Sequence, residues 1–166
     1  MLRRLIHTTD DPVLTLLRVT LGVLFFAHGA QKALGWFGGS GWSATMTFFT
    51  QNMGIPALFA ALAILAEFLG GIGLILGLLG RIAALSIAIE MVVALFLVHL
   101  PNGLFMNWFG AQKGEGFKYH LLAISIAVVV TVRGAGALSL DRVLENWLAG
   151  GRQIPIRMAH PEPSRG

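Results

Sequence analysis

The sequence contains no cysteine among its 166 residues, and only 12% of the residues are charged. The missing thiols exclude disulfide exchange, thiolate metal sites and iron–sulfur ligation by this chain. A soluble domain carries about 25% charged residues, whereas 55% of this sequence is hydrophobic. Between Ala33 and Ala66 there is no Asp, Glu, Lys or Arg. This composition is typical of an integral membrane protein.

Four segments are apolar enough to cross a bilayer as helices, which need about 20 residues each. They cover residues 13–34, 55–79, 82–100 and 117–132, and the last is the shortest. Pro12 and Pro56 stand at the expected starts of two helices, where a missing N–H costs nothing. We therefore predict an all-α fold, with a short N-terminal segment at residues 1–12 and a four-helix transmembrane bundle at residues 13–137.

The chain after the bundle is predicted to form a short amphipathic helix at residues 138–148. Ser139 is a suitable N-cap, and the apolar residues follow helical spacing at Leu140, Val143, Leu144, Trp147 and Leu148. Such a helix either lies on the membrane surface or docks a soluble partner, and the sequence does not separate the two. Residues 149–166 are rich in Gly, Pro and Arg and are predicted to be a flexible tail.

The distribution of basic residues predicts the orientation in the membrane. One side of the predicted bundle carries arginines at positions 3, 4, 81, 133, 142, 152, 157 and 165, and the other carries only Lys32, Lys113 and Lys118. The side rich in cations faces the cytoplasm in most membrane proteins. Both termini are therefore expected to be cytoplasmic, with the loops 35–54 and 101–116 outside. The net charge of +4 thus reflects orientation, and no nucleic-acid partner is expected.

A few polar residues lie inside the predicted spans, where they are costly and usually functional. Arg18 and Glu90 both fall towards the cytoplasmic side, so we predict that they form an ion pair. Glu67 lies near the middle of the second span. Since a carboxyl at this depth is costly whether it is ionised or neutral, a functional role is as plausible as a structural one.

A second polar layer lies towards the outer surface and contains His28, Gln31, His99 and His120. Helix phase makes His28 and Gln31 its firmest members. His99 is nine residues from Glu90, about half a turn out of phase, so the two face one axis only if the helix bends. With Glu67, this layer is expected to bind the head group of a quinone or a similar polar-tipped apolar molecule. No metal site is expected, because three or four ligands would have to converge from separate helices.

Short motifs along most of the chain, from Arg18 to Leu144, resemble the DoxX family of small bacterial membrane proteins. The order and spacing of the motifs make the resemblance specific: FFAHGAQK at 25–32, GWFGG at 35–39, EFLGG at 67–71, GRIAA at 80–84, NWFG at 107–110 and YHLL at 119–122. The resemblance implies a four-helix bundle in the bacterial cytoplasmic membrane. It also implies functional polar positions at His28, Gln31, Lys32, Glu67, Arg81 and His120.

The resemblance further implies a role beside oxidoreductases, since the family is similar to the small membrane subunit of thiosulfate:quinone oxidoreductase. The first hypothesis is a membrane subunit or anchor of an oxidoreductase complex linked to quinones, sulfur or oxidative stress. It would have no covalently bound cofactor and would use a quinone. Its expected partners are the lipid bilayer and a redox protein, with a second copy of the chain as a further candidate. The alternatives are a small solute or proton transporter and a purely structural scaffold.

Overall fold

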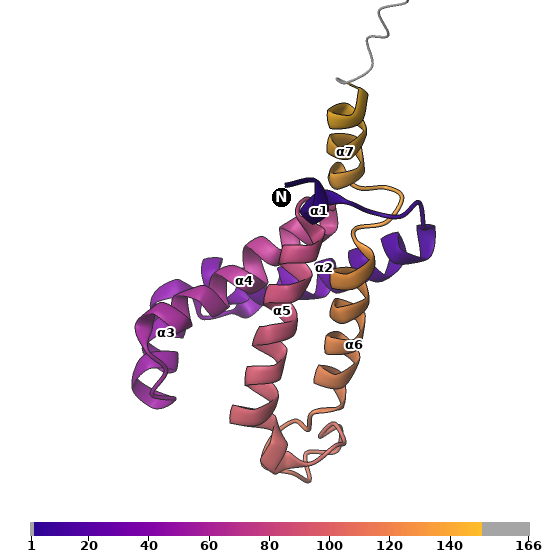
Figure 1. Ribbon diagram of the computed structural model, residues 1–166. Helices are drawn as coiled ribbons and strands as arrows, with labels where there is room; N and C mark the ends of the chain where they lie inside the picture. Colours follow the sequence, from indigo (N-terminus) through magenta and orange to yellow (C-terminus); the bar gives the residue numbers. More distant parts are fainter. Residues whose placement is uncertain (1, 151–166) are drawn as a thin grey trace, which may run out of the picture.

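The computed structural model describes residues 2–150, and all regular structure within them is helical (Figure 1). This confirms the predicted all-α fold. In chain order the elements are α1 Leu2–Ile6, α2 Pro12–Leu34, η1 Trp36–Gly38, α3 Gly41–Thr47, η2 Phe48–Asn52, α4 Ala57–Leu76, α5 Gly80–Ala94, η3 Leu95–His99, η4 Leu100–Asn102, α6 Lys118–Arg133 and α7 Leu140–Gly150. Most of the predicted tail, residues 151–166, lies outside the described residues.

Within residues 2–150, three helices are long and apolar enough to cross a membrane: Pro12–Leu34, Ala57–Leu76 and the continuous run Gly80–Asn102. The fourth helix, α6, has 16 residues and spans about 24 Å, at about 1.5 Å per residue. It packs along α5 and runs antiparallel to it (Figure 1). Together the four helices agree with the predicted four-helix arrangement.

The long helices begin and end where the sequence supplies capping residues. At the start of α2, Pro12 takes the first turn and the Asp11 carboxylate accepts hydrogen bonds from the backbone N–H groups of Val13 (2.8 Å) and Leu14 (3.3 Å). At its end, Gly35 adopts φ +73°, a left-handed conformation that glycine adopts without strain. These local signals define both ends of α2.

The helices form two antiparallel pairs that meet at one end of the molecule. In Figure 1, α2 and α4 run obliquely to α5 and α6, and α1 and α7 lie where the pairs meet. Residues buried between the pairs build one apolar core, which comprises Leu21, Phe25, Leu74, Ala83, Ala84, Ile87, Ala88, Met91, Ala123, Ala127 and Val130. The outward sides of the spans expose many large apolar residues, as expected for surfaces that contact lipid.

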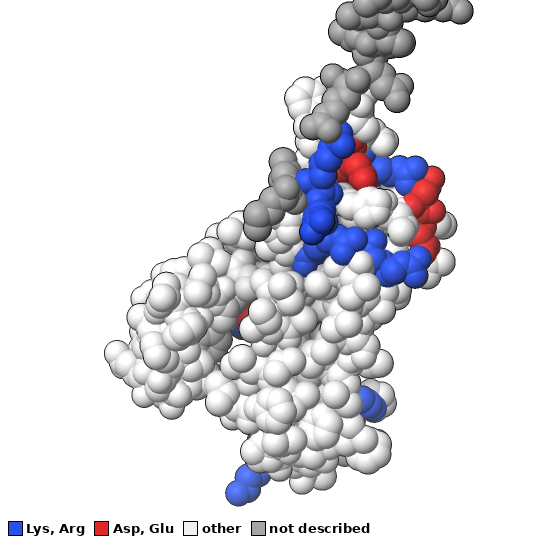
Figure 2. All heavy atoms as spheres, in the orientation of Figure 1, with Lys and Arg blue, Asp and Glu red and all other residues white. Residues whose placement is uncertain are grey.

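Charged side chains gather at the end that carries α1 and α7, while the surface over the spans is almost uncharged (Figure 2). We call this the arginine-rich end. It includes Arg3, Arg4, Arg81, Arg133 and Arg142. The segments between helices at the opposite ends of the two pairs, residues 35–56 and 103–117, expose aromatic side chains such as Trp36, Phe37, Trp108 and Phe109.

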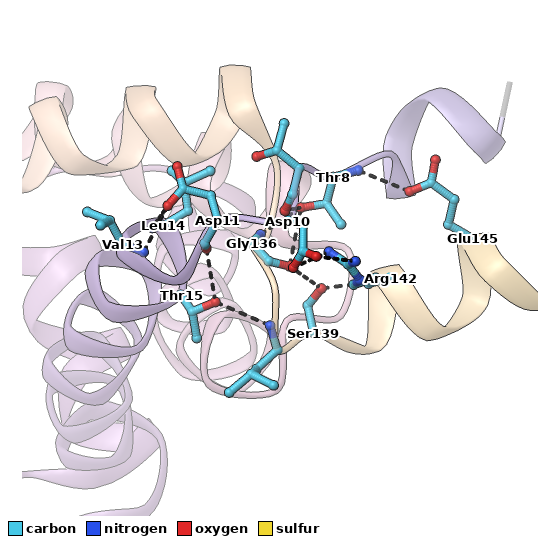
Figure 3. A network of polar contacts seen from close by, with 12 residues as sticks. Thr8, Asp10, Asp11, Val13, Leu14, Thr15, Gly136, Ser139, Arg142 and Glu145 are labelled. Atoms are coloured by element: carbon cyan, nitrogen blue, oxygen red, sulfur yellow. Dashed lines mark hydrogen bonds and ion pairs between the residues drawn. The ribbon is translucent and has the colours of Figure 1, made fainter.

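Helix α7 is held to the arginine-rich end by its polar side (Figure 3). Ser139 caps it by accepting a hydrogen bond from the Arg142 backbone N–H (3.3 Å). The Arg142 side chain pairs with Asp10 (2.6 Å), and the Glu145 carboxylate accepts a hydrogen bond from the Thr8 backbone N–H (3.2 Å). The apolar side of α7 is therefore left exposed, with Val143 and Trp147 at 63% and 74% exposure.

Candidate functional site

A buried ion pair joins α2 to α4 in the middle of the molecule. The Lys32 ammonium contacts a carboxylate oxygen of Glu67, whose side chain is only 3% exposed, while the Lys32 side chain is 29% exposed. Both residues were predicted as functional candidates, but their pairing was not. Removing two charges from water is costly unless they neutralise each other. The pair therefore explains how Glu67 is accommodated at this depth.

Glu90 of α5 brings a second carboxyl to the same place. Its side chain lies close enough to Glu67 and Lys32 for their charges to act on it. One of its oxygens, Oε2, is buried and has no hydrogen-bond partner among residues 2–150. Two carboxyls thus share one lysine.

The predicted ion pair between Arg18 and Glu90 is wrong. Arg18 is buried at the arginine-rich end, where its guanidinium donates to backbone carbonyls of two segments. The acceptors are Leu74 and Ile75 (2.9 Å to Ile75) at the end of α4, and Ala135 (2.7 Å) and Leu138 (2.6 Å) before α7. The last carbonyls of a helix have no partner within the helix. The guanidinium has five N–H donors, so it can bond several of these carbonyls at once, whereas a single carboxylate would use only some of its donors.

Arg81 and Asp141 complete this capping arrangement. Arg81 donates to the carbonyls of Thr131 (2.8 Å) and Val132 (2.7 Å) near the end of α6. The Asp141 carboxylate accepts from the backbone N–H groups of Leu79 (2.7 Å) and Gly80 (2.8 Å) at the start of α5. Burial raises the pKa of Asp141, although these two N–H groups and the two arginines oppose the rise. Arg81, singled out by the family resemblance, thus stabilises helix ends.

Tyr119 and His120 of α6 add two further polar groups. The Tyr119 hydroxyl lies within range of the Glu67 charge, and its ring stacks on Phe25 with centroids 6.4 Å apart. His120 is 6% exposed. Within residues 2–150, neither the Tyr119 hydroxyl nor His120 Nδ1 has a hydrogen-bond partner. Buried polar atoms are almost always satisfied in folded proteins, so each of these two atoms, like Glu90 Oε2, is a position where a further polar group is expected.

His99 lies beside His120, at the end of a helix that changes pitch. The rings of His99 and His120 lie with centroids 4.0 Å apart, and His99 Nδ1 is 2.8 Å from the carbonyl of Glu115. Leu95–His99 forms a π-helical turn, in which wider hydrogen-bonded loops change the phase of the residues that follow. This turn therefore changes the phase of His99 relative to Glu90, and the His99 ring lies beside His120.

His28 and Gln31, expected to be the firmest members of the outer layer, are not brought together with Glu67. His28 is exposed on the outside of α2. The Gln31 amide donates to the carbonyl of Phe37 (3.2 Å) and holds the turn that follows α2. The helical positions of His28 and Gln31 did not predict which side of α2 is buried. The buried side carries Phe25, Gly29 and Lys32 instead.

Lys32 contacts Glu67, and the charge of Glu67 reaches Glu90 and Tyr119. The rings of Tyr119, His120 and His99 follow one another at centroid distances of 5.7 Å and 4.0 Å. We call these six side chains the polar cluster. They come from α2, α4, the α5–η3 run and α6. Figure 2 shows acidic and basic atoms at the bottom of a recess in the uncharged middle of the surface. Sequence reasoning missed Tyr119 as a site residue, although it is the single tyrosine of the chain and precedes His120.

The chemistry available in the polar cluster is hydrogen bonding and proton exchange. It contains a cation, two carboxyls, two imidazoles and a phenol, which serve as acids and bases. Among residues 2–150, no group of three or more His, Cys, Asp or Glu is arranged to hold a metal ion. An uncharged ligand with oxygen acceptors could instead satisfy the unpartnered atoms.

Comparisons with known proteins identify related membrane proteins. The family model described as DoxX matches residues 13–100. The chain is 32% identical to "Putative oxidoreductase CatD" of Bacillus subtilis, over 76% of this chain and 82% of that protein. It is 27% identical to "Inner membrane protein YqjF" of Escherichia coli, over 83% of this chain and 97% of that protein. An uncharacterized membrane protein of Mycobacterium tuberculosis is 29% identical over 85% and 86% of the two chains. No solved structure matches.

Proposed function

The chain belongs to the DoxX family of membrane proteins, and from this premise we propose that it is a multi-pass component of an oxidoreductase system in the bacterial inner membrane. Two relatives support the proposal, since one is named a putative oxidoreductase and another an inner membrane protein. In this proposal the chain binds a quinone head group and a partner redox protein supplies the electrons.

The observation that carries the proposal is the polar cluster, which gathers groups from all four long helices around Glu67. A quinone head group has two carbonyl oxygens, which accept hydrogen bonds. Tyr119 and His120 each carry a buried polar atom without a partner in residues 2–150, and the phenol and an imidazole N–H are both donors. The apolar tail of a quinone would extend along the exposed apolar sides of the spans, in contact with lipid.

We propose that the arginine-rich end faces the cytoplasm and that the polar cluster lies towards the outer side. The arginines at that end support this orientation through the positive-inside rule. Cysteine introduced at Ser40, which is exposed in the segment between α2 and α4, should react in intact cells with a thiol reagent that does not cross membranes. Labelling at Asn146 of α7 instead of Ser40 would reverse the orientation.

The binding proposal is tested with a matched pair of variants and a short-tailed quinone analogue. Glu67→Gln keeps the shape of the side chain but removes the charge that orients Lys32, so the Kd of the analogue should rise about tenfold, equivalent to about 1.4 kcal/mol. His28→Ala changes an exposed residue of α2 and should leave the Kd unchanged. Equal Kd values for both variants and the wild type, with normal folding, would favour the scaffold hypothesis.

The redox role is tested separately, by purification in mild detergent and mass spectrometry of co-purifying proteins and lipids. A co-purifying redox enzyme, and a loss of its quinone-linked activity with Glu67→Gln, is the expected result. Transport of a solute by the purified chain alone in liposomes would replace this proposal with a transporter.

A further inference from the structure

The two carboxyls of the polar cluster are unequal in their surroundings. Glu67 contacts the Lys32 ammonium directly, whereas Glu90 reaches Lys32 only as a more distant charge. The single lysine therefore balances one carboxylate. If both carboxyls were ionised, the apolar interior would hold an uncompensated negative charge.

The burial of Glu90 also requires a proton. One of its carboxyl oxygens, Oε2, is buried and has no hydrogen-bond partner among residues 2–150. An ionised carboxyl is strongly disfavoured where its oxygen meets neither a donor nor a cation, and the nearby charge of Glu67 disfavours it further. The proton belongs on Glu90, because the lysine stabilises the ionised form of Glu67.

The other titratable groups around the cluster do not supply the missing positive charge. The imidazole rings of His99 and His120 lie tilted by 39° to each other with centroids 4.0 Å apart, so a positive charge on one disfavours a positive charge on the other. His99 uses Nδ1 at the Glu115 carbonyl, and His120 is 6% exposed. Tyr119 is a donor in its neutral form. The charge balance therefore rests on Lys32, Glu67 and Glu90.

We propose that Glu90 is held as a neutral acid beside the ionised Lys32–Glu67 pair. In this state it donates a hydrogen bond to an oxygen atom of an uncharged ligand. The ligand class rests on the proposed function, whereas the protonation of Glu90 does not. A neutral acid, a phenol and an imidazole together favour a carbonyl-bearing ligand over an organic anion or cation. The polar cluster thus selects ligands by hydrogen-bond acceptors and not by charge.

Infrared spectroscopy tests the protonation directly, since a protonated carboxyl has a C=O band that a carboxylate lacks. The baseline is the double variant Glu67→Gln/Glu90→Gln, in which contributions from Asp141 and surface carboxyls cancel. At neutral pH and without ligand, the wild type should show one protonated carboxyl above this baseline and Glu90→Gln none. Lys32→Met should show two, because no cation remains. Glu67→Gln should show none, since Glu90 then pairs with Lys32.

Labelling with an apolar carbodiimide, which reacts with protonated carboxyls, identifies the residue. Trypsin cleavage after Arg81 separates the peptide that contains Glu67 from the one that contains Glu90. The wild type should be labelled on the second peptide, with labelling that decreases as the pH rises. Absence of the infrared band in the wild type, or a label mainly on Glu67, would overturn the inference. Neither measurement uses a quinone or a redox partner, so failure here is distinct from failure of the proposed function.

Discussion

At the scale of single residues, Asp141 shows how much this structure depends on satisfying helix ends. Its carboxylate accepts the first N–H groups of α5 from a position 61 residues further along the chain. Asp141 is 1% exposed, so water cannot replace it when the side chain is removed. It lies near Arg18, which satisfies the carbonyls at the end of α4. The α4–α5 hairpin is thus stabilised on both sides of its turn by side chains from other elements.

Asp141→Ala should lower thermal stability in detergent more than a surface substitution does. It leaves the buried Gly80 N–H without an acceptor, at a cost of about 1–3 kcal/mol, and removes the acceptor of the part-buried Leu79 N–H as well. Asp10→Ala is the control, because Asp10 is 69% exposed and pairs with Arg142 at the surface, where ion pairs contribute less than about 1 kcal/mol. Thermal unfolding of both variants measures the difference. Equal losses would show that Asp141 does not stabilise the start of α5.

The sequence predicted the depth of Arg18 correctly but misplaced Glu90, which lies near Glu67 and Lys32, and it did not predict the side-chain partners. The depth argument correctly placed Arg18 near the arginine-rich end, yet it assigned Glu90 as its partner because both seemed to need an opposite charge. Backbone carbonyls were the alternative that the pattern did not reveal, since a helix end creates acceptors that no sequence motif marks. The Lys32–Glu67 pair was missed for a similar reason: it depends on how closely α2 and α4 approach.

At the scale of elements, the approach of α2 to α4 is set by glycine. A Cβ atom at Gly71 would lie 2.5 Å from the backbone N of Phe26, whereas one at the neighbouring Gly70 would make ordinary contacts at 3.5 Å. Small residues allow helix backbones to come close in membranes. The same two helices carry Lys32 and Glu67, so this approach also determines the geometry of the polar cluster.

Gly71→Ala should therefore destabilise the protein and weaken quinone-analogue binding, because α2 must move away from α4 and Lys32 moves with it. Gly70→Ala, one residue away on the same helix, should have little effect on either measurement. Thermal unfolding and analogue titration of both variants provide the comparison. If the two substitutions have the same effect, the glycine contact does not control the polar cluster.

The attachment of α7 should depend on pH through Glu145. Burial alone would raise the pKa of this carboxyl, but the hydrogen bonds from His7 and the Thr8 backbone N–H, with the charges of His7 and Arg142, lower it overall. A lowered pKa means that the ionised form favours the folded state. This contribution is complete above the ordinary pKa of a glutamate and is lost as the pH falls through the lowered value.

Amide hydrogen exchange in α7, compared between neutral and acidic pH after correction for intrinsic rates, measures this dependence. Protection should fall on acidification in the wild type, and Glu145→Gln should already show reduced protection at neutral pH with a smaller change. Unaltered protection in Glu145→Gln would mean that the other contacts of α7 are enough to hold it in place and that Glu145 does not contribute to its attachment.

At the scale of the whole molecule, composition and hydropathy were enough to predict an all-α membrane protein, because the bilayer restricts spanning segments to a few structures. The polar cluster could be predicted only in part. Glu67, Lys32 and His120 were recognised from their cost at depth and from the family resemblance. His99 depended on a π-helical turn at Leu95–His99 that propensity does not reveal. His28 was expected inside the site but is exposed.

The polar cluster is proposed to bind an uncharged, carbonyl-bearing ligand. Photo-crosslinking with a quinone analogue tests whether a ligand head group reaches it. The analogue carries its reactive group on the head, and mass spectrometry locates the adducts in protein reconstituted in lipid. The account predicts adducts near Lys32, Glu67 and Tyr119, on helices that are distant in sequence, with a marked loss in Glu67→Gln. Adducts spread over the lipid-exposed sides of the helices, at the same yield in Glu67→Gln, would contradict it.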